Sequence, residues 1–431
     1  MTRVHLMGIG GSGVSALAKV FLARGDQVSG CDVKASDTTR LLEQSGVRVF
    51  TGHSREHVGG QELLVFSGAI RSGSEELEAA RAAGVRVLTR AEMLAELIAG
   101  SESVAVAGTH GKTTVTLMAG DVLEAGGFDP TVLAADGASA RAGRSRWLVA
   151  EADESDGSLT MHRPRRAIVT NVELDHPDHF ASLEEVSILF RDFLGAIPRE
   201  GLAILCADDQ HLRTMSTPAR RVTYGFAGDA DYRCAGASGH FGVYVRGTHL
   251  GEIALAVPGR HNIQNATAAV ALGVELGIPF PIVEDALAEF KGAHRRLERV
   301  GRFRGAEVYD DYGHHPTEVL ATIAAARELP GRRLVLVFQP HRFTRLRALM
   351  GEFARSLEGA DELIVGEVYA AGEPNPDGLS ARQLAEMVPK AVFCPDFECI
   401  RRRLAEIVVD GDLLLFMGAG DIGRLARELA D

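Results

Sequence analysis

The sequence predicts an α/β protein of three domains. Short apolar segments that read as strands alternate with helical patterns along the chain, which is typical of doubly wound, mostly parallel sheets. A chain of 431 residues is longer than most chains that fold around a single hydrophobic core, so two or three domains are expected. The character of the chain changes near residues 100 and 293. We therefore expect domains over residues 1–100, 101–293 and 294–431.

The composition excludes several classes of protein. The formal net charge of −12 argues against a general affinity for nucleic acid. No uninterrupted apolar run reaches the roughly 18 residues of a membrane-spanning helix, so we expect a cytoplasmic protein with no membrane partner. The five cysteines form neither a C-x-x-C pair nor a cluster spaced with histidines. This pattern predicts a reducing compartment and no structural zinc.

The first strand, Val4–Met7, leads into a glycine-rich turn and a helix over Val14–Ala23. The turn, Gly8-Ile9-Gly10-Gly11-Ser12-Gly13, matches G-x-G-x-x-G, and Asp32 ends the next strand, so this domain is expected to be Rossmann-like. Such a turn binds a pyrophosphate, either of NAD(P), with Asp32 on a ribose hydroxyl, or of another nucleotide. The motif alone does not choose. Further strands are expected at Val47–Phe50, Leu63–Phe66 and Val85–Leu88, with helices near 37–44, 74–83 and 91–99.

A second glycine turn opens the central region after a strand that begins at Ser103. It reads Gly108-Thr109-His110-Gly111-Lys112-Thr113-Thr114 and leads into a helix. Backbone N–H groups of such a turn bind phosphate, while the Lys and a hydroxyl serve the phosphates and Mg²⁺. The loop is shorter than G-x-x-x-x-G-K-[ST], because Val106 stands where the first glycine is usual. The flanking strand and helix nevertheless predict a nucleoside triphosphate site in a P-loop ATPase-type mixed sheet.

Acidic side chains follow two strands of the central region, Trp147–Ala150 and 167–170. The carboxyl ends of parallel strands carry the ligand sites of open α/β sheets. We therefore expect these side chains to bind a metal beside the triphosphate, the alternative being solvated acidic turns. The residues are Glu151, Asp153, Glu154 and Asp156 after the first strand, and Glu173, Asp175, His176, Asp178 and His179 after the second.

The last region again alternates strand and helix. Two of its loops, 310–316 and 339–345, follow strand ends and carry histidines, aspartates, a tyrosine and arginines that are hard to explain as stability devices. The polar stretch 293–298 precedes them and is expected to be a hinge. The expected strands are Glu307–Asp310, Leu334–Phe338, Glu362–Val365, Ala391–Phe393 and Leu413–Met417.

Seven motifs together resemble the Mur ligases. They are GTHGKTT (108–114), EADESD (151–156), TNVELDH (170–176), PGRHNIQN (258–265), DDYGHHP (310–316), FQPHRFTR (338–345) and MGAGDI (417–422). They run through all three regions in order, and they most resemble the members that add L-alanine to UDP-N-acetylmuramate. The resemblance implies an ATP-dependent, ADP-forming ligase of peptidoglycan precursor synthesis, which joins L-alanine to the lactyl carboxylate through an acyl phosphate. It also implies that Gly8–Gly13 holds a uridine diphosphate rather than a redox cofactor.

The resemblance implies a role for each site residue. The UDP-sugar would contact Gly8, Gly10, Gly11, Gly13, Asp32 and Ser67. ATP would contact Gly108, Thr109, His110, Gly111, Lys112, Thr113, Thr114, Asn262, Asn265, Arg295 or Arg296, and Asp311. Thr113 would bind one Mg²⁺, and Glu151 and His176 would ligate or orient a second. Tyr312, His314 and His315 would shape the alanine pocket, while Arg342 and Arg345 would hold the amino-acid carboxylate and the transferring phosphate. The catalytic group would be Lys112, Glu151, His176, Arg342 and Arg345.

Three alternatives stay open at this point. A ligase of the same family that recycles murein by adding a whole tripeptide shares the GTHGKTT loop. An NAD-dependent oxidoreductase would explain residues 1–100 but would leave Lys112 without a purpose. A non-catalytic nucleotide-binding regulator would not need the loops at 310–316 and 339–345.

Overall fold

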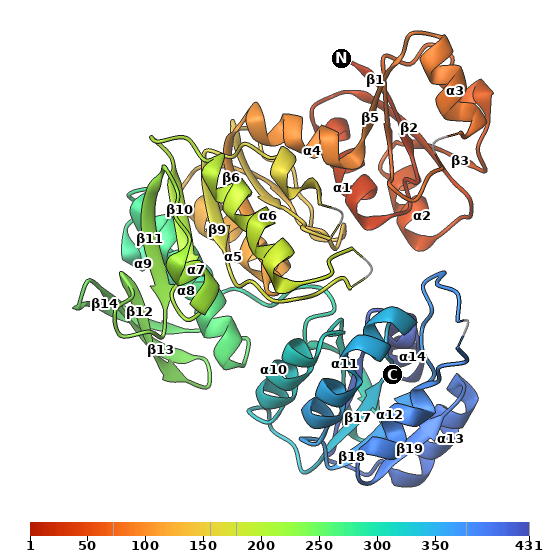
Figure 1. Ribbon diagram of the computed structural model, residues 1–431, viewed down its shortest axis with the longest axis vertical. Helices are drawn as coiled ribbons and strands as arrows, with labels where there is room; N and C mark the ends of the chain where they lie inside the picture. The colour runs from red at the N-terminus through yellow and green to blue at the C-terminus, as the bar shows by residue number, and fades with distance from the viewer. Residues whose placement is uncertain (72, 156, 178, 376, 431) are drawn as a thin grey trace.

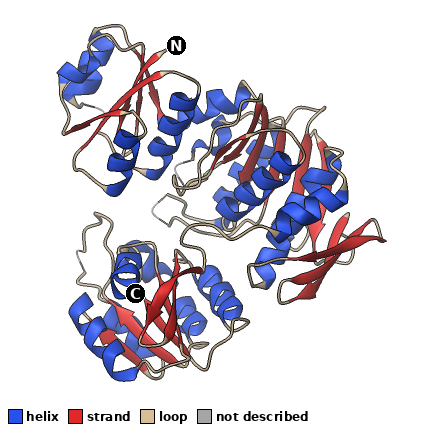
Figure 2. Ribbon diagram, turned by 180° about the vertical axis from the view of Figure 1, so that it is seen from behind, coloured by secondary structure: helices blue, strands red, loops and turns tan. Residues whose placement is uncertain are grey.

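The computed structural model describes residues 1–71, 73–155, 157–177, 179–375 and 377–430. Over these residues the strands form three sheets, of five, nine and six strands, each with its own helices (Figures 1 and 2). The predicted α/β fold of three domains is confirmed. Asp156 and Asp178 of the two acidic runs lie outside the described residues.

The N-terminal sheet has the strand order β3-β2-β1-β4-β5, and its neighbouring strands run parallel. Because β1 lies between β2 and β4, the glycine turn after β1 stands at the switch point where open sheets bind ligands. Helices α1, α2 and α4 pack on one face of the sheet, and α3 with the 3-10 helix η1 packs on the other. The elements are β1 Arg3–Met7, α1 Ser12–Ala23, β2 Gln27–Asp32, α2 Asp37–Gln44, β3 Arg48–Thr51, η1 Arg55–Val58, β4 Leu63–Phe66, α3 Glu75–Ala82, β5 Arg86–Thr89 and α4 Arg90–Ala99.

The central sheet has the order β14-β13-β12-β11-β10-β9-β6-β8-β7. Strand β6, which carries the phosphate loop, pairs in parallel with β8 on one side and β9 on the other. The two predicted acidic strand ends therefore flank the phosphate loop. The elements are β6 Glu102–Ala107, α5 Lys112–Ala125, β7 Thr131–Leu133, β8 Trp147–Glu151, η2 Ser158–Met161, β9 Arg166–Val169, α6 Leu183–Gly195, β10 Leu202–Cys206, α7 Gln210–Thr214, β11 Arg220–Gly225, β12 Tyr232–Ala237, β13 His240–Val245, β14 Thr248–Ala254, α8 Arg260–Glu275 and α9 Phe280–Ala288.

The C-terminal sheet has the order β15-β16-β20-β17-β18-β19. Alternate residues of β17 face opposite cores: Leu334, Leu336 and Phe338 pack with α10, α11 and α12, whereas Val335 and Val337 pack with α13 and α14. The elements are β15 Glu298–Phe303, β16 Ala306–Asp311, α10 Pro316–Ala326, β17 Leu334–Phe338, α11 Phe343–Leu357, β18 Glu362–Gly366, α12 Ala381–Met387, β19 Ala391–Cys394, α13 Phe397–Ile407, β20 Leu413–Met417 and α14 Ile422–Leu429.

Strand β20 lies between β16 and β17 and runs parallel to both, so the three loops that follow these strands lie together at their carboxyl ends. These are the two polar loops predicted after β16 and β17 and the turn at 418–421 after β20. Strand β15 was not predicted: it pairs antiparallel with β16 and begins at Glu298, inside the stretch expected to be a hinge. None of the helices in the described residues combines the length and apolar character that crossing a bilayer requires.

Candidate active site

The phosphate loop lies at the carboxyl end of β6 and is shaped by two glycines. Gly108 has a φ of +131°, and a Cβ there would lie 2.0 Å from Thr170 Oγ1. Gly111 has a φ of +81° and stands directly before Lys112, the first residue of α5. Both positions favour glycine, because side chains rarely adopt these backbone angles. The turn thus presents the N-terminus of α5, where backbone N–H groups and the helix dipole favour an anion.

Lys112 is the cation of this loop. Its Nζ donates to the carbonyl oxygens of Gly108 at 2.7 Å and Thr109 at 3.2 Å, and to Glu154 Oε2 at 2.7 Å. Asp153 Oδ1 lies 3.8 Å from the same atom. Burial lowers the pKa of Lys112, but the surrounding carboxylates outweigh burial and raise it above its usual value. Lys112 is therefore a fixed positive charge at the entrance to α5.

Glu151 ends β8 and lies beside Thr113. Its Oε2 accepts hydrogen bonds from Thr113 Oγ1 at 2.9 Å and from the backbone N–H of Ala135 at 2.8 Å. Burial raises the pKa of Glu151, while Lys112 and the two hydrogen bonds oppose that shift. The predicted metal residues Thr113 and Glu151 are thus in direct contact.

Asp175 and His176 follow β9. Arg345 of the C-terminal domain donates from Nε at 2.9 Å and from Nη2 at 2.7 Å to Asp175 Oδ1. Both side chains are almost fully buried, so this is a buried ion pair between two domains. Burial lowers the pKa of His176, which favours the neutral imidazole that can act as a ligand. His176 has a φ of +56°, an angle that a non-glycine residue adopts only under local constraint.

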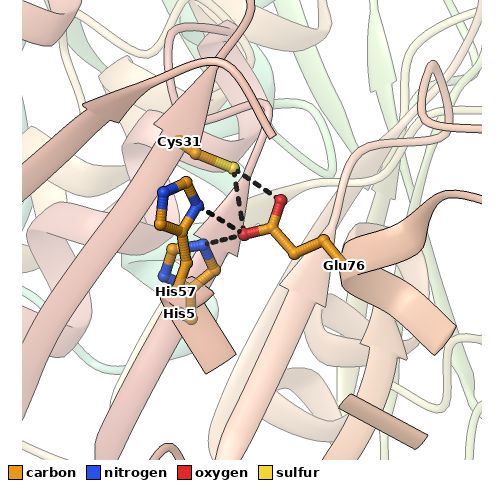
Figure 3. A group of neighbouring side chains, drawn as sticks. All are labelled: His5, Cys31, His57 and Glu76. Atoms are coloured by element: carbon orange, nitrogen blue, oxygen red, sulfur yellow. Dashed lines mark hydrogen bonds and ion pairs between the residues drawn. The ribbon is translucent and has the colours of Figure 1, made fainter. Parts of the chain in front are cut away.

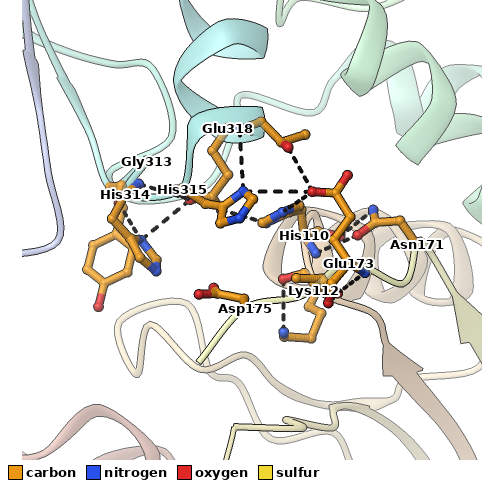
Figure 4. A network of polar contacts seen from close by, with 12 residues as sticks. His110, Lys112, Asn171, Glu173, Asp175, Gly313, His314, His315 and Glu318 are labelled. Carbon is orange, nitrogen blue, oxygen red and sulfur yellow. Dashed lines mark hydrogen bonds and ion pairs between the residues drawn. The ribbon is translucent and has the colours of Figure 1, made fainter. Parts of the chain in front are cut away.

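A second set of contacts joins the same two domains (Figure 4). His110 Nε2 lies 3.3 Å from Glu173 Oε2, and its Nδ1 lies 3.5 Å from Glu318 Oε1 of α10. Thr317 Oγ1 donates to Glu173 Oε2 at 2.7 Å. Burial lowers the pKa of His110, but the two glutamates outweigh burial and raise it to about 9. The phosphate loop is thereby linked to the C-terminal domain by an imidazolium between two carboxylates.

A cavity between the central and C-terminal domains collects most of the predicted ATP residues. Burial raises the pKa of one of them, Asp311, to about 6. Asn265 Oδ1 stands 2.9 Å from the point where a Cβ on Gly111 would lie, so the start of α8 touches the phosphate loop. The predicted residues that line the cavity are His110, Gly111, Thr114, Asn262, Asn265, Arg296 and Asp311.

The structure separates the two adjacent arginines. Arg295 is not among the described residues that line the cavity. Its guanidinium donates to Asp310 Oδ2 at 3.1 Å and to the Gly418 carbonyl at 2.7 Å, within its own domain. Arg296 lines the cavity, where its Nη1 lies 3.4 Å from Glu318 Oε1. Of the two residues, Arg296 is therefore the one placed to meet a nucleotide.

The first glycine turn is braced by Asp32. The N–H of Gly10 donates to Asp32 Oδ2 at 2.9 Å, and a Cβ on Gly10 would meet that oxygen. Gly8 has a φ of +75° and lies against Ser67, the residue after β4. A Cβ on Gly13 would lie 2.7 Å from Arg90 Cδ. The predicted UDP-sugar residues therefore lie together, with Asp32 at the end of β2 and Ser67 after β4 packed against the turn.

A second cavity extends from this turn to Glu151, whose carboxylate contacts Thr113 of the phosphate loop. It lies between the N-terminal and central domains and is lined by residues of both. From the N-terminal domain it is lined by Gly11, Ser12, Gly13, Ser67 and Arg90, and from the central domain by Ala134, Ala135, Glu151 and Asp153, among others. A ligand bound to the first turn would thus extend toward Glu151.

The remaining predicted residues lie in the loops of the C-terminal domain. His315 caps α10 through Nδ1, which accepts from the Thr317 N–H at 3.3 Å. His314 Nδ1 contacts the Tyr312 carbonyl at 3.0 Å, and burial lowers the pKa of His314 to about 4. Arg342 has a φ of +67° and lies 3.7 Å from Glu373. Tyr312 and His314 pack edge to face, with their ring centroids 5.3 Å apart.

Sequence reasoning missed several residues of the site. Arg90 lines the second cavity from the start of α4, and Asp208 lines the first from the segment after β10. Glu318 is shared by His110, Arg296 and His314. Glu318 stands at the third position of the helix that Pro316 opens, and Arg90 and Asp208 each follow a strand end. For Arg90 and Asp208, a position at the end of a strand was the sequence pattern that could have identified them as site residues.

The sequence was compared with known proteins. Residues 3–102 match the profile described as Mur ligase family, catalytic domain; residues 106–273 match the Mur ligase middle domain, and residues 295–420 match the Mur ligase, glutamate ligase domain. A UDP-N-acetylmuramate--L-alanine ligase of Solidesulfovibrio magneticus is 44% identical, with 98% of this chain and 96% of that protein covered. The protein of the same name from Sorangium cellulosum is 43% identical, over 99% and 95%.

Solved structures give a consistent picture. The crystal structure of a UDP-N-acetylmuramate-alanine ligase from Thermotoga maritima matches with a TM-score of 0.83 and 28% identity, covering 100% of this chain and 98% of that chain. A murein peptide ligase from Psychrobacter arcticus matches with a TM-score of 0.73 and 23% identity, over 100% and 98%. At that identity the second likeness shows a shared fold only.

Loss of the buried ion pair should open the molecule. Arg345→Ala leaves Asp175 as a buried, unpaired charge, which costs about 3–5 kcal/mol unless the domains part and readmit water. We expect a larger radius of gyration by small-angle X-ray scattering. Adding Asp175→Asn to Arg345→Ala should restore the compact form, and Arg347→Ala, an exposed arginine of the same helix, should change nothing. An unchanged radius in Arg345→Ala would contradict the assigned role.

The His110 contacts should depend on pH. The pKa of His110 is raised from 6.5 to about 9 in the folded protein, so its charged pairing contributes stability fully below pH 6.5 and loses it as the pH rises through about 9. Thermal unfolding of the wild type and of His110→Gln should therefore differ most near pH 6 and converge above pH 9. A difference in midpoint that stays constant over this range would show that the pairing is not ionic.

Proposed function

The chain belongs to the Mur ligase family, and on this premise we propose that it joins L-alanine to the lactyl carboxylate of UDP-N-acetylmuramate while converting ATP to ADP and phosphate. It is an ATP-dependent, amide-forming ligase of peptidoglycan precursor synthesis. The observation that carries the proposal is the second cavity, which runs from Gly11 and Gly13 to Glu151 beside the phosphate loop. This cavity supports a UDP-sugar whose diphosphate lies at the glycine turn and whose lactyl carboxylate lies near the γ-phosphate of ATP.

The reaction requires activation of a carboxylate, because a carboxylate and an amine do not condense at neutral pH. An oxygen of the lactyl carboxylate attacks the γ-phosphorus of ATP, the bond to ADP breaks, and an acyl phosphate forms. The neutral amine of L-alanine then attacks the acyl carbon, phosphate leaves with its electron pair, and the amide nitrogen loses a proton. Phosphoryl transfer of this kind depends on positioning and charge neutralisation more than on covalent help from the protein.

The central domain, residues 101–293 in our assignment, would hold ATP. Lys112 would exchange its contacts with Gly108 and Glu154 for β- and γ-phosphate oxygens, because its pKa keeps it charged. The phosphate loop from Gly108 to Thr114 would bind phosphate through backbone N–H groups. Asn262, Asn265, Arg296 and Asp311 would contact the nucleotide in the first cavity, which all four line.

A divalent cation fits beside the phosphate loop. The Thr113 hydroxyl and the Glu151 carboxylate are the hard oxygen donors that Mg²⁺ prefers, and burial of Glu151 favours a cation there. His176, whose imidazole is neutral, would ligate it or orient the sugar carboxylate. When bound, Mg²⁺ supplies neutralising charge to phosphate and carboxylate oxygens.

The N-terminal and C-terminal domains would bind the other two substrates. We assign residues 1–100 to the UDP-sugar, with Gly8, Gly10, Gly11 and Gly13 on the diphosphate and Asp32 and Ser67 beside them. We assign residues 294–431 to closure over ATP and to L-alanine. There Arg342 and Arg345 would hold the amino-acid carboxylate and the transferring phosphate, and Tyr312, His314 and His315 would line the alanine pocket. Closure excludes water from the acyl phosphate. Because the enzyme consumes ATP, we place it in the cytoplasm.

The choice of amino acid is tested by a substrate panel. Phosphate release is measured with UDP-N-acetylmuramate and ATP in the presence of L-alanine, other amino acids, or the murein tripeptide. We expect turnover with L-alanine and none with the tripeptide. Turnover with the tripeptide alone would instead favour the murein-recycling activity.

The separation of the two nucleotide sites is tested at the phosphate loop. Lys112→Ala removes the charge that would neutralise the β- and γ-phosphates, so turnover should fall by at least a thousandfold. Binding of UDP-N-acetylmuramate, measured by calorimetry without ATP, should stay within about twofold because the glycine turn lies on another domain. Lys19→Ala, a lysine that bonds to the Gly137 and Ala138 carbonyls, is the matched control and should keep turnover. Loss of UDP-sugar binding in Lys112→Ala would contradict separate sites.

A further inference from the structure

A buried cluster of His, Cys and Glu side chains lies in the N-terminal domain, away from both cavities of the ligase site (Figure 3). It is formed by His5 of β1, Cys31 of β2, His57 of η1 and Glu76 of α3. One potential ligand atom from each of these residues lies within 4.8 Å of all the others. The side chains of His5 and Glu76 are fully buried. The activity proposed above uses none of these four residues.

His5 places one ring nitrogen beside a carboxylate with no aligned hydrogen bond. Its Nδ1 lies 2.9 Å from Ser29 Oγ, which also lies 3.4 Å from the Val4 carbonyl and accepts from Gln61 Nε2 at 3.2 Å. Its Nε2 makes no aligned hydrogen bond to the described residues and lies 2.9 Å from Glu76 Oε1. A proton or a metal ion that lies near both atoms would satisfy them.

An imidazole and a thiol, both possible metal ligands, also lie beside the Glu76 carboxylate. His57 Nδ1 lies 2.9 Å from Oε1, and Cys31 Sγ lies 3.2 Å from Oε2. His53 stands at the margin, with Nδ1 3.2 Å from Cys31 Sγ.

We propose that His5, Cys31, His57 and Glu76 form a binding site for a zinc ion. Thiolate, imidazole and carboxylate are the donors that Zn²⁺ takes in tetrahedral sites, where bonds of about 2.0–2.3 Å place the ligands about 3.3–3.8 Å apart. The ligand atoms of the cluster lie at least 2.9 Å and no more than 4.8 Å apart, a range that includes this spacing. The hydrogen bond from His5 Nδ1 to Ser29 is the outer contact that typically orients a ligating histidine.

A surface pocket gives a metal ion access to the cluster, and the cluster contacts the base of the first glycine turn. His57 and Ser29 line a surface pocket together with Phe50, whose ring stacks on His57 at 4.2 Å. Behind the cluster, the Cys31 carbonyl accepts from the N–H groups of Gly8 and Ile9 at 2.8 and 3.1 Å. An ion that ties β1, β2, η1 and α3 together would therefore stiffen the base of the first glycine turn.

The sequence predicted no structural zinc because the four ligands come from four separate elements. Spacing rules detect pairs such as C-x-x-C, in which one turn supplies two ligands. Here only the fold brings residues 5, 31, 57 and 76 together.

Cobalt titration of the full chain tests the proposal. Protein treated with EDTA and freed of it is titrated with Co²⁺, which reports a thiolate ligand through a near-ultraviolet charge-transfer band. We expect one equivalent of Co²⁺ to produce this band and Zn²⁺ to displace it. Cys31→Ser should abolish the band, while Cys399→Ser in the C-terminal domain should retain it. Glu76→Gln should weaken Co²⁺ binding at least tenfold.

Two results would overturn the proposal. Absence of the band in the wild-type chain would mean that a proton, shared between His5 and Glu76, occupies the position instead. Persistence of the band in Cys31→Ser, with a far-ultraviolet circular dichroism spectrum matching the wild type, would place the metal on another cysteine. The cation position at Thr113 and Glu151 contains no sulfur, so it produces no such band and the outcome is independent of the ligase assignment.

Discussion

The positive charge of Lys112, held among carboxylates at the start of α5, is the interaction on which the rest of the site depends. Glu154, Asp153 and Glu151 keep this lysine charged despite its burial, and they stand where β8 delivers them because β8 is a neighbour of β6. An ammonium group beside the N-terminus of a helix is suited to the phosphates of a nucleotide. The carboxylates around it would be suited to a divalent cation.

Contact between the central and C-terminal domains also depends on ion pairs. Arg345 neutralises Asp175 on the loop after β9, and Glu318 and Glu173 hold His110 of the phosphate loop. Each of these ion pairs lies within a few residues of a group that would bind nucleotide or metal. Binding and domain contact consequently share the same charges, so a ligand that alters one set of pairs also alters the fit between the domains.

The sequence predicted the parts of this structure that are local. The glycine turns at 8–13 and 108–114 were identifiable because a strand, a turn and a helix are contiguous, and the acidic runs because they end strands. The position of β6 between β8 and β9 depends on strand order, which no local pattern contains. The same limit hid Glu318 and Arg90, and it made Arg295 and Arg296 look equivalent although one of them points into its own domain. Strand β15 was missed because its polar start resembled a hinge.

The ligase reaction activates the sugar carboxylate by phosphoryl transfer before the amine attacks. Labelling both lactyl carboxylate oxygens of UDP-N-acetylmuramate with ¹⁸O tests this order when the phosphate released during turnover with L-alanine and ATP is analysed. An acyl phosphate transfers one labelled oxygen to each phosphate, so mass spectrometry should find one ¹⁸O per phosphate. Phosphate without label would contradict the account, because it would mean that water rather than the carboxylate attacks ATP.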